Sequence, residues 1–143
     1  ANKKASTEGL AFFSEDELVD DLKKLNAKIG IKALRNFVDA YRNKEVTVDM
    51  KLDQLCYRLG YFYCKLAVKI LDWELVLLKT DTMKNEAVAV VDADRKFSLF
   101  PPMYFYRLMN NPDQNNTSAL TLNMIAAGDV PPSKEGSYTV MLG

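Results

Sequence analysis

The segment from Asp49 to Leu71 constrains the fold more than any other part of the sequence. Its apolar residues recur every three or four positions, the spacing of one helical face: Leu52, Leu55, Leu59, Phe62, Leu66 and Ile70. A second side carries Tyr57, Tyr61, Cys64 and Val68. A helix that is apolar around so much of its circumference normally packs against several elements. We therefore expect a central helix, capped by Asp49, with the rest of the chain around it.

Gly60 lies in the middle of this predicted helix. A glycine at such a position costs about 1 kcal/mol relative to alanine. A close approach of another helix or strand is the usual compensation, because only glycine leaves room for it. Gly60 therefore predicts a crossing point.

Two shorter amphipathic helices are predicted before the central one. Ser14 and Glu17 have the spacing of a capping box, in which two side chains bond the free amides at a helix start. The apolar stripe that follows is Leu18, Leu22, Leu25 and Ile29. Gly30 is a typical helix stop, so we expect the first helix to end there and a second to run over residues 32–43. The short link between them predicts antiparallel neighbours.

After Trp73 the sequence changes to short segments rich in strand-forming residues. Residues 73–80 and 86–93 predict two antiparallel strands joined by a polar link, and residues 96–100 predict a third. Pro101 and Pro102 fit the start of a helix, which we expect from Pro102 to Met109.

The C-terminal part is less clearly patterned. Residues 118–127 fit a helix capped by Thr117 or Ser118 and closed by Gly128, but their alternation fits a strand equally well. Residues 137–142 predict a terminal strand.

These elements predict one α+β domain over residues 1–143. We expect three N-terminal helices packed on a small antiparallel β-sheet, with one or two further C-terminal helices. The length is that of one ordinary domain, and the 48% apolar and 27% charged shares are typical of water-soluble globular proteins. Residues 1–13 are interpreted as a frayed terminus or the remainder of a removed leader.

The absence of histidine narrows the chemistry. It removes the Ser-His-Asp and Cys-His nucleophile systems and the imidazole metal ligand. Cys56 and Cys64 are the only cysteines, and eight residues of helix would separate them by about 12 Å, too far for a disulfide. Free thiols favour the cytoplasm, although buried thiols also survive in the periplasm or outside the cell.

We expect no enzymatic activity, no metal and no cofactor. Four carboxylates flank the predicted hairpin, at Asp81, Glu86, Asp92 and Asp94. Such oxygen ligands can hold a hard cation, but turns are rich in aspartate for reasons of geometry and solvation. The 19 basic and 19 acidic residues balance, which argues against nucleic acid or an anionic membrane as partner. No apolar run has the length of a membrane span.

Two segments are candidate partner-binding surfaces. The first is the acidic run SEDELVDD, with the site candidates Glu15, Asp16 and Asp20. These carboxylates stabilise a helix start, and they also form an acidic face suited to a basic partner. The second is residues 97–111, FSLFPPMYFYRLMNN, in which Phe100, Phe105 and Leu108 are expected in the core. Its site candidates are Tyr104, Tyr106 and Arg107, since tyrosine and arginine carry much of the binding energy at interfaces.

Several motifs between Leu52 and Asn111 resemble a bacterial family known only as a domain of unknown function. They are Leu52-Asp53 and Leu59-Gly60 in one helix, Trp73 with Val76, Phe100-Pro101 at a helix start, and Arg107. The glycine that usually follows the acidic hairpin turn in that family is replaced here by DTMKNEA. Small α+β proteins of this kind often lie beside secreted-toxin loci, so the resemblance implies an immunity or accessory protein.

We therefore expect a non-enzymatic protein-binding protein, most concretely a bacterial immunity-type protein that occludes a toxin or effector. The alternative is a small-molecule or lipid-like ligand-binding domain with an aromatic pocket, lined by residues 57–63 and 97–106. A self-associating module, forming a homo-oligomer, is a third interpretation. A pocket protein would gain thermal stability from small apolar molecules, whereas a protein binder would gain little.

Overall fold

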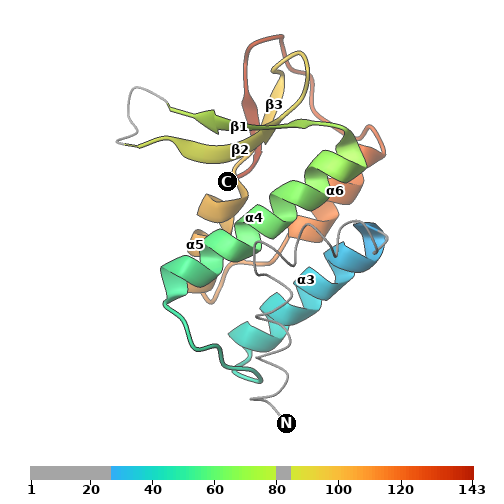
Figure 1. The fold of residues 1–143 in the computed structure, drawn as a ribbon. Helices are drawn as coiled ribbons and strands as arrows, with labels where there is room; N and C mark the ends of the chain where they lie inside the picture. The colour runs from blue at the N-terminus through green and yellow to red at the C-terminus, as the bar shows by residue number, and fades with distance from the viewer. Residues whose placement is uncertain (1–26, 80–84) are drawn as a thin grey trace.

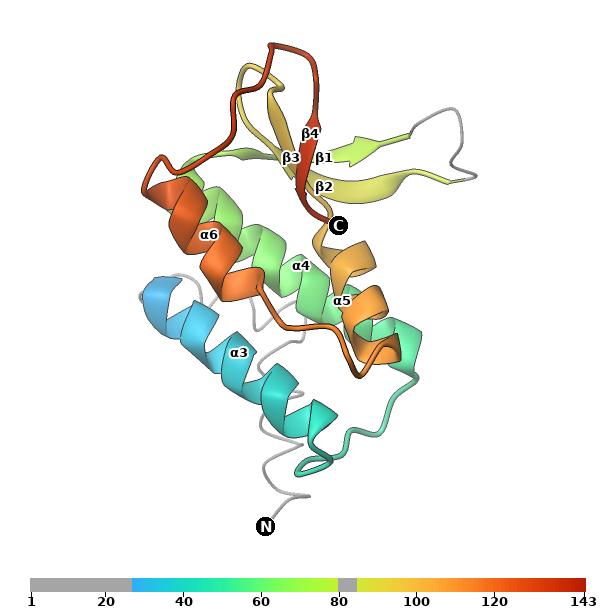
Figure 2. The ribbon, with the colours of Figure 1, turned by 180° about the vertical axis from the view of Figure 1, so that it is seen from behind.

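The computed structural model describes residues 27–79 and 85–143. The helices in these ranges are α3 (Ala27–Arg42), α4 (Leu52–Leu71), α5 (Pro101–Asn110) and α6 (Ser118–Ala126). The strands are β1 (Glu74–Leu78), β2 (Ala87–Val91), β3 (Phe97–Leu99) and β4 (Thr139–Leu142). Figures 1 and 2 show the sheet at one end of the molecule with the helices gathered on one side of it. The α+β class is therefore confirmed.

α4 is the central helix that the sequence predicts. It packs against α3, α5 and α6, and its far end reaches β1 and β2. Leu55, Leu59, Phe62 and Leu66 from its apolar face are almost completely buried. The predicted cap is wrong, because the helix begins at Leu52 after Lys51, not at Asp49. Asp53 accepts the amide of Gln54 at 2.9 Å, so a carboxylate within the first turn satisfies one free N–H.

Two of the helix contacts of α4, those with α5 and α3, each involve a glycine. A Cβ on Gly60 would lie 2.8 Å from the carbonyl carbon of Pro101, so α5 can approach this closely only over a glycine. The predicted crossing at Gly60 is confirmed. Gly30 does not stop a helix as predicted: α3 runs through it, and a Cβ there would lie 2.7 Å from Cδ2 of Leu66 on α4.

The sheet is mixed rather than wholly antiparallel. Its strand order is β1-β2-β3-β4, with antiparallel pairing at β1–β2 and β2–β3 and parallel pairing at β3–β4. The predicted antiparallel sheet is thus correct for three strands and wrong for the fourth. The reason is the connection: α5 and α6 lie between β3 and β4 in the chain, and a crossover of this kind returns a strand parallel to its predecessor.

The helical alternative holds for residues 118–126, which form α6. Gly128 follows it with a φ of 78°, a backbone conformation that favours glycine, and its amide bonds the carbonyl of Ile125 at 3.0 Å. Within the described residues two helices, α3 and α4, precede the sheet. The helix predicted from Ser14 lies, up to Asn26, outside those residues. No described helix is long and apolar enough to cross a membrane.

Candidate partner-binding groove

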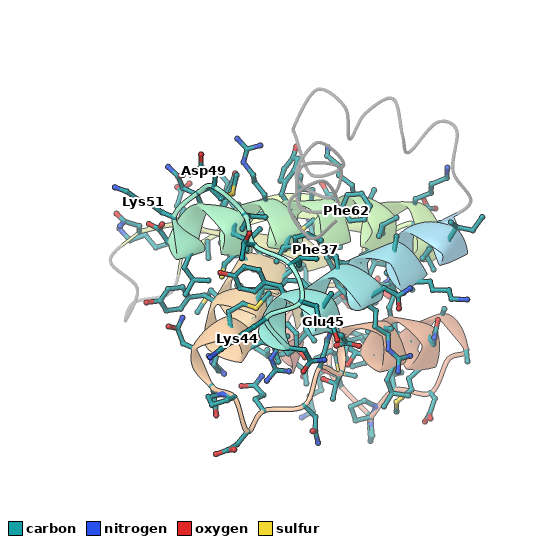
Figure 3. All side chains as sticks on the ribbon, turned by 90° about the horizontal axis from the view of Figure 1, so that it is seen from below. Phe37, Lys44, Glu45, Asp49, Lys51 and Phe62 are labelled. Carbon is teal, nitrogen blue, oxygen red and sulfur yellow. The ribbon has the colours of Figure 1, made fainter. Side chains whose placement is uncertain are left out.

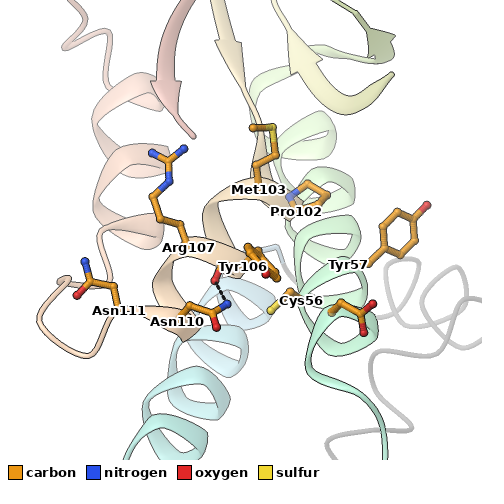
Figure 4. A pocket seen from close by; sticks show the side chains of 9 residues that line it. Cys56, Tyr57, Pro102, Met103, Tyr106, Arg107, Asn110 and Asn111 are labelled. Carbon is orange, nitrogen blue, oxygen red and sulfur yellow. Dashed lines mark hydrogen bonds between the residues drawn. The ribbon is translucent and has the colours of Figure 1, made fainter. Parts of the chain in front are cut away.

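A groove of about 610 Å³ lies between α4 and α5. α4 contributes Asp53, Cys56 and Tyr57. α5 contributes Pro102, Met103, Tyr106, Arg107 and Asn110, and Asn111 follows it. Figure 4 shows Tyr57 projecting from α4 while Met103 and Arg107 project from α5. We call this feature the α4–α5 groove.

Two contacts set the geometry of the groove. Gly60 meets the first turn of α5, whereas Cys56, one turn earlier on α4, donates its thiol hydrogen to the carbonyl of Phe105 at 3.6 Å. The two helices therefore run antiparallel along this interface. Because the sides of α5 that carry Phe105 and Leu108 are buried, the opposite positions 103, 106, 107 and 110 face the groove. Their spacing of three, one and three is that of a single helical face.

Large apolar side chains are exposed in this groove. Tyr57 is 52% exposed, Met103 43% and Tyr106 54%. Tyr57 stacks on Tyr61 with 6.2 Å between ring centroids, and the Nζ of Lys65 lies 5.0 Å from the Tyr61 ring. The Tyr57 and Tyr61 rings are thus restrained by contacts along α4, which lowers the conformational entropy lost when a partner covers Tyr57.

The α4–α5 groove is lined by one positively and one negatively charged side chain. Arg107 lies on the α5 wall and Asp53 on the α4 wall, and both residues are exposed. The ion pairs among the described residues join Arg95 to Glu74 and Lys96 to Asp94, and neither involves a groove residue. Arg107 and Asp53 are therefore open to charges on a partner.

The thiols do not make the groove a nucleophilic site. Burial, followed by the Asp53 carboxylate, raises the pKa of Cys56 to about 11. Burial likewise raises the pKa of Cys64 to about 12. A thiolate is the reactive form, so both cysteines stay unreactive at neutral pH. Both are free and buried, as predicted.

The sequence-predicted site residues separate into three groups. Tyr106 and Arg107 line the groove. Tyr104 is only 3% exposed, so it is not part of a binding surface. Its hydroxyl accepts the amide of Thr117 at 2.7 Å and donates to the carbonyl of Asn115 at 3.3 Å, which anchors the loop before α6. Glu15, Asp16 and Asp20 lie outside the described residues.

The same loop is held from its other side by α3. Arg42 donates to three backbone carbonyls, at 3.1 Å to Asn111, 3.3 Å to Pro112 and 2.7 Å to Gln114. Asn111 also lines the groove, so this end of the wall is supported by a distant helix. An irregular segment is thereby kept in place without secondary structure of its own.

The link between α3 and α4 differs from the groove in character. Figure 3 views the molecule from this side, with Lys44, Glu45, Asp49 and Lys51 labelled along the link. All four are exposed, and their two positive and two negative charges give no field of a single sign. Such a surface is typical of a solvated face rather than of a docking site.

Tyr57 and Met103 are not among the protein-binding candidates that the sequence indicates. Tyr57 belongs to the second side of the central helix, and the sequence places residues 57–63 in the alternative aromatic pocket. Met103 carries a usable signal, because it lies three and four positions before Tyr106 and Arg107 and so shares their face.

Comparisons of the chain with protein-family models, with curated protein sequences and with solved structures found no match. The resemblance to a bacterial domain-of-unknown-function family therefore stays a prediction. Residues 27–79 and 85–143 contain no group of three or more side chains suited to hold a metal ion.

Proposed function

We propose that this chain is a non-enzymatic protein-binding protein whose α4–α5 groove receives apolar side chains of a protein partner. One observation carries the proposal: Tyr57, Met103 and Tyr106, from two helices, are each about half exposed within one groove. Exposed apolar area costs roughly 25 cal/mol per Å² relative to burial. A cluster of large side chains left in this state favours an interaction site.

The openness of the groove favours a protein over a small molecule. Small-ligand sites bury roughly 70–90% of the ligand, which requires walls that enclose it. Here the large side chains Tyr57, Met103 and Tyr106 remain about half exposed, so a small ligand beside them would stay largely in water. The lining also includes two tyrosines, a methionine and an arginine, which are residue types enriched at protein interfaces.

An amphipathic helix is the partner element that fits best. A groove between two packed helices accepts the side-chain ridge of a third. The ten residues of α5 give it a length of about 15 Å, nearly three helical turns. An acidic side chain on the partner would meet Arg107, and a basic one would meet Asp53. The most concrete partner is a toxin or effector, as the resemblance implies for an immunity-type protein.

A small-molecule or lipid-like ligand is the second candidate. The volume of about 610 Å³ falls within the range of known ligand sites, roughly 300–1,000 Å³. The groove also joins the two aromatic segments, residues 57–63 and 97–106, that the pocket interpretation names. This candidate shares the site but differs in the ligand.

Calorimetric titration against the product of a neighbouring toxin-like gene tests the proposal. Tyr106→Ala should weaken binding by about 30-fold or more, the effect of a typical interface hot spot of about 2 kcal/mol. Leu120→Ala is the matched control, because Leu120 is 59% exposed on α6 outside the groove, and it should bind like the wild type. Equal affinity of the Tyr106 variant and the wild type would refute a groove-bound partner.

Thermal shift measurements separate the second candidate. If small apolar molecules stabilise the wild type and fail to stabilise Tyr106→Ala, the groove is a ligand pocket and the protein-partner proposal is wrong. If they stabilise neither protein, while the partner binds only the wild type, the proposal is supported.

A further inference from the structure

One side of α4 faces away from the other described helices. α3 and α5 pack on its other sides, where Leu66 meets Gly30 and Gly60 meets the first turn of α5. Figure 1 shows α4 in front of α5 and α6, and Figure 2 shows it behind them. Five side chains on this side are exposed or partly exposed, three of them apolar and two basic: Tyr57, Tyr61, Val68, Arg58 and Lys65. They fall within about 100° of the helix circumference, and we call this side the outer face of α4.

The outer face has one apolar and one basic margin. Arg58 and Lys65 are seven residues apart, about two helical turns, so they point the same way, on the margin nearer α3. The ion pairs found within residues 27–79 and 85–143 involve neither side chain. The tyrosines and the valine form the other margin, and Tyr57 is 52% exposed. A helix that covers this face therefore needs an apolar stripe with acidic side chains along one margin.

Residues 14–25 of the same chain have this pattern. They lie outside the described residues, and their sequence predicts an amphipathic helix with a stripe of three leucines: Leu18, Leu22 and Leu25. In such a helix Glu17 and Asp21, four residues apart, share one margin of the stripe, whereas Asp20 points to the opposite side. The segment thus combines an apolar stripe with one acidic margin.

The position of α3 brings this segment within reach of the outer face. α3 begins at Ala27, and Gly30 in its first turn meets Leu66 near the end of α4. A helix over residues 14–25 is about 18 Å long, the same length as the stretch of α4 that precedes Leu66 by twelve residues. A segment that runs back from Ala27 along this stretch lies parallel to α4 and reaches the level of Leu55.

We propose that residues 14–25 dock as a helix on the outer face of α4, parallel to it, with Glu17 beside Arg58 and Asp21 beside Lys65. Counted back from Leu66, Glu17 reaches the level of Arg58, and Asp21 comes within about 5 Å of the level of Lys65 along the axis. The three leucines then cover the apolar margin of α4.

The winding of the two helices places the charges on the same side of this contact. On α4 the basic positions follow the apolar ones in the direction of winding, and on the segment the acidic positions precede the leucines. Two parallel helices wind in the same sense, so where they face each other the following margin of one meets the preceding margin of the other. Opposite charges are therefore paired along the whole contact. The contact does not depend on a partner in the α4–α5 groove.

Disulfide trapping in the full chain, with Cys56→Ala and Cys64→Ala as background, tests the placement. Leu22→Cys with Tyr61→Cys should form a disulfide within one chain, because the two positions face each other within bonding reach. Asp20→Cys with Tyr61→Cys is the matched control and should form none, since position 20 points away from α4. No disulfide in the first pair, or equal formation in both, would overturn the proposal. A disulfide between two chains would also overturn it, because the segment would then cover another copy.

A charge reversal in the chain with its native cysteines tests the direction of the segment. Asp21→Lys should raise the hydrogen exchange rates of the amides in residues 17–25 about threefold or more, because an exposed ion pair becomes a repulsion. Adding Lys65→Glu should restore the rates. Asp20→Lys makes the same change on the opposite side of the segment and should leave the rates close to those of the wild type. Equal effects of the two single variants, or no recovery in the double variant, would show that the segment does not dock in this way.

Discussion

α5 presents two faces of similar composition that have different surroundings. Tyr104, Phe105 and Leu108 are buried, whereas Met103 and Tyr106 are about half exposed. Phe105 packs edge-on against Tyr63 at 6.0 Å and against Tyr104 at 5.3 Å between ring centroids. The aromatic content of the segment therefore does not identify its function. The position of each side chain around the axis of α5 decides whether it is buried or exposed. The crossing at Gly60 determines which side of α5 faces α4.

The largest expected effect is on the buried face. Phe105→Ala should lower the free energy of unfolding by about 3–5 kcal/mol, because it leaves a cavity between α4 and α5. Urea unfolding followed by circular dichroism measures this change. A loss below about 1 kcal/mol would show that Phe105 is not a core residue.

Gly60→Ala tests the crossing that separates the two faces. Its Cβ would meet the backbone of α5, which cannot move without opening the interface, so we expect a loss of about 1–3 kcal/mol. Gly30→Ala is the matched control. Its Cβ would meet the flexible end of Leu66, and the higher helix propensity of alanine offsets the cost by about 1 kcal/mol. Equal losses in the two variants would contradict the distinction.

Tyr104→Phe should have an intermediate effect on stability, about 1–2 kcal/mol. The change removes only the hydroxyl and leaves the amide of Thr117 without its acceptor at 2.7 Å. Faster hydrogen exchange at Thr117 should accompany the loss of stability. Unchanged exchange there would mean that the hydroxyl does not anchor the loop.

Tyr106→Phe and Tyr106→Ala should change the free energy of unfolding by no more than about 0.5 kcal/mol, because the side chain is on the surface. The same alanine variant should lose partner binding. A large loss of stability in Tyr106→Ala would show that this residue belongs to the buried face, and the contrast between the two faces would fail.

The two thiols should lower the free energy of unfolding at alkaline pH but not at neutral pH. The pKa values of Cys56 and Cys64 rise from 9.0 to about 11 and about 12 on folding, so the folded chain retains these protons longer than the unfolded chain. Their contribution to stability is complete below pH 9 and is lost as the pH rises through the folded-state values. Replacing both cysteines with alanine should remove this part of the alkaline destabilisation, measured by urea unfolding between pH 8 and pH 11. An unaltered pH dependence would contradict the shifts.

The sequence predicts those elements whose signal is local. The spacing of Leu55, Leu59 and Phe62 indicates α4, and the two prolines mark the start of α5 to within one residue. Gly30 misleads because a glycine at a helix end and a glycine at a helix crossing look alike, and only Leu66 on another helix decides between them. The parallel direction of β4 likewise depends on the path of the chain through α5 and α6.

Only part of the groove could be predicted in the same way. Tyr106 and Arg107 were candidates from composition, but Tyr104 could not be separated from them without knowing which side of α5 meets α4. Residues two positions apart on a helix, such as Tyr104 and Tyr106, differ by about 200° of rotation, so they have opposite surroundings. The volume of the groove depends on how α4 and α5 cross at Gly60. The sequence predicts a crossing at this glycine but not that α5 is the element that crosses there.

Arg42 links positions far apart along the chain. Its bonds to Asn111 and Gln114 span 69 and 72 residues, and the intervening chain contains α4, three strands and α5. Contacts of such sequence separation form slowly, because a long loop must close before any of them is gained. During folding, α4 and the β1–β2 hairpin would therefore take shape first. We expect the Arg42 guanidinium to bond the loop only at a late stage, and the end of the groove at Asn111 to be among the last parts of the protein to become ordered.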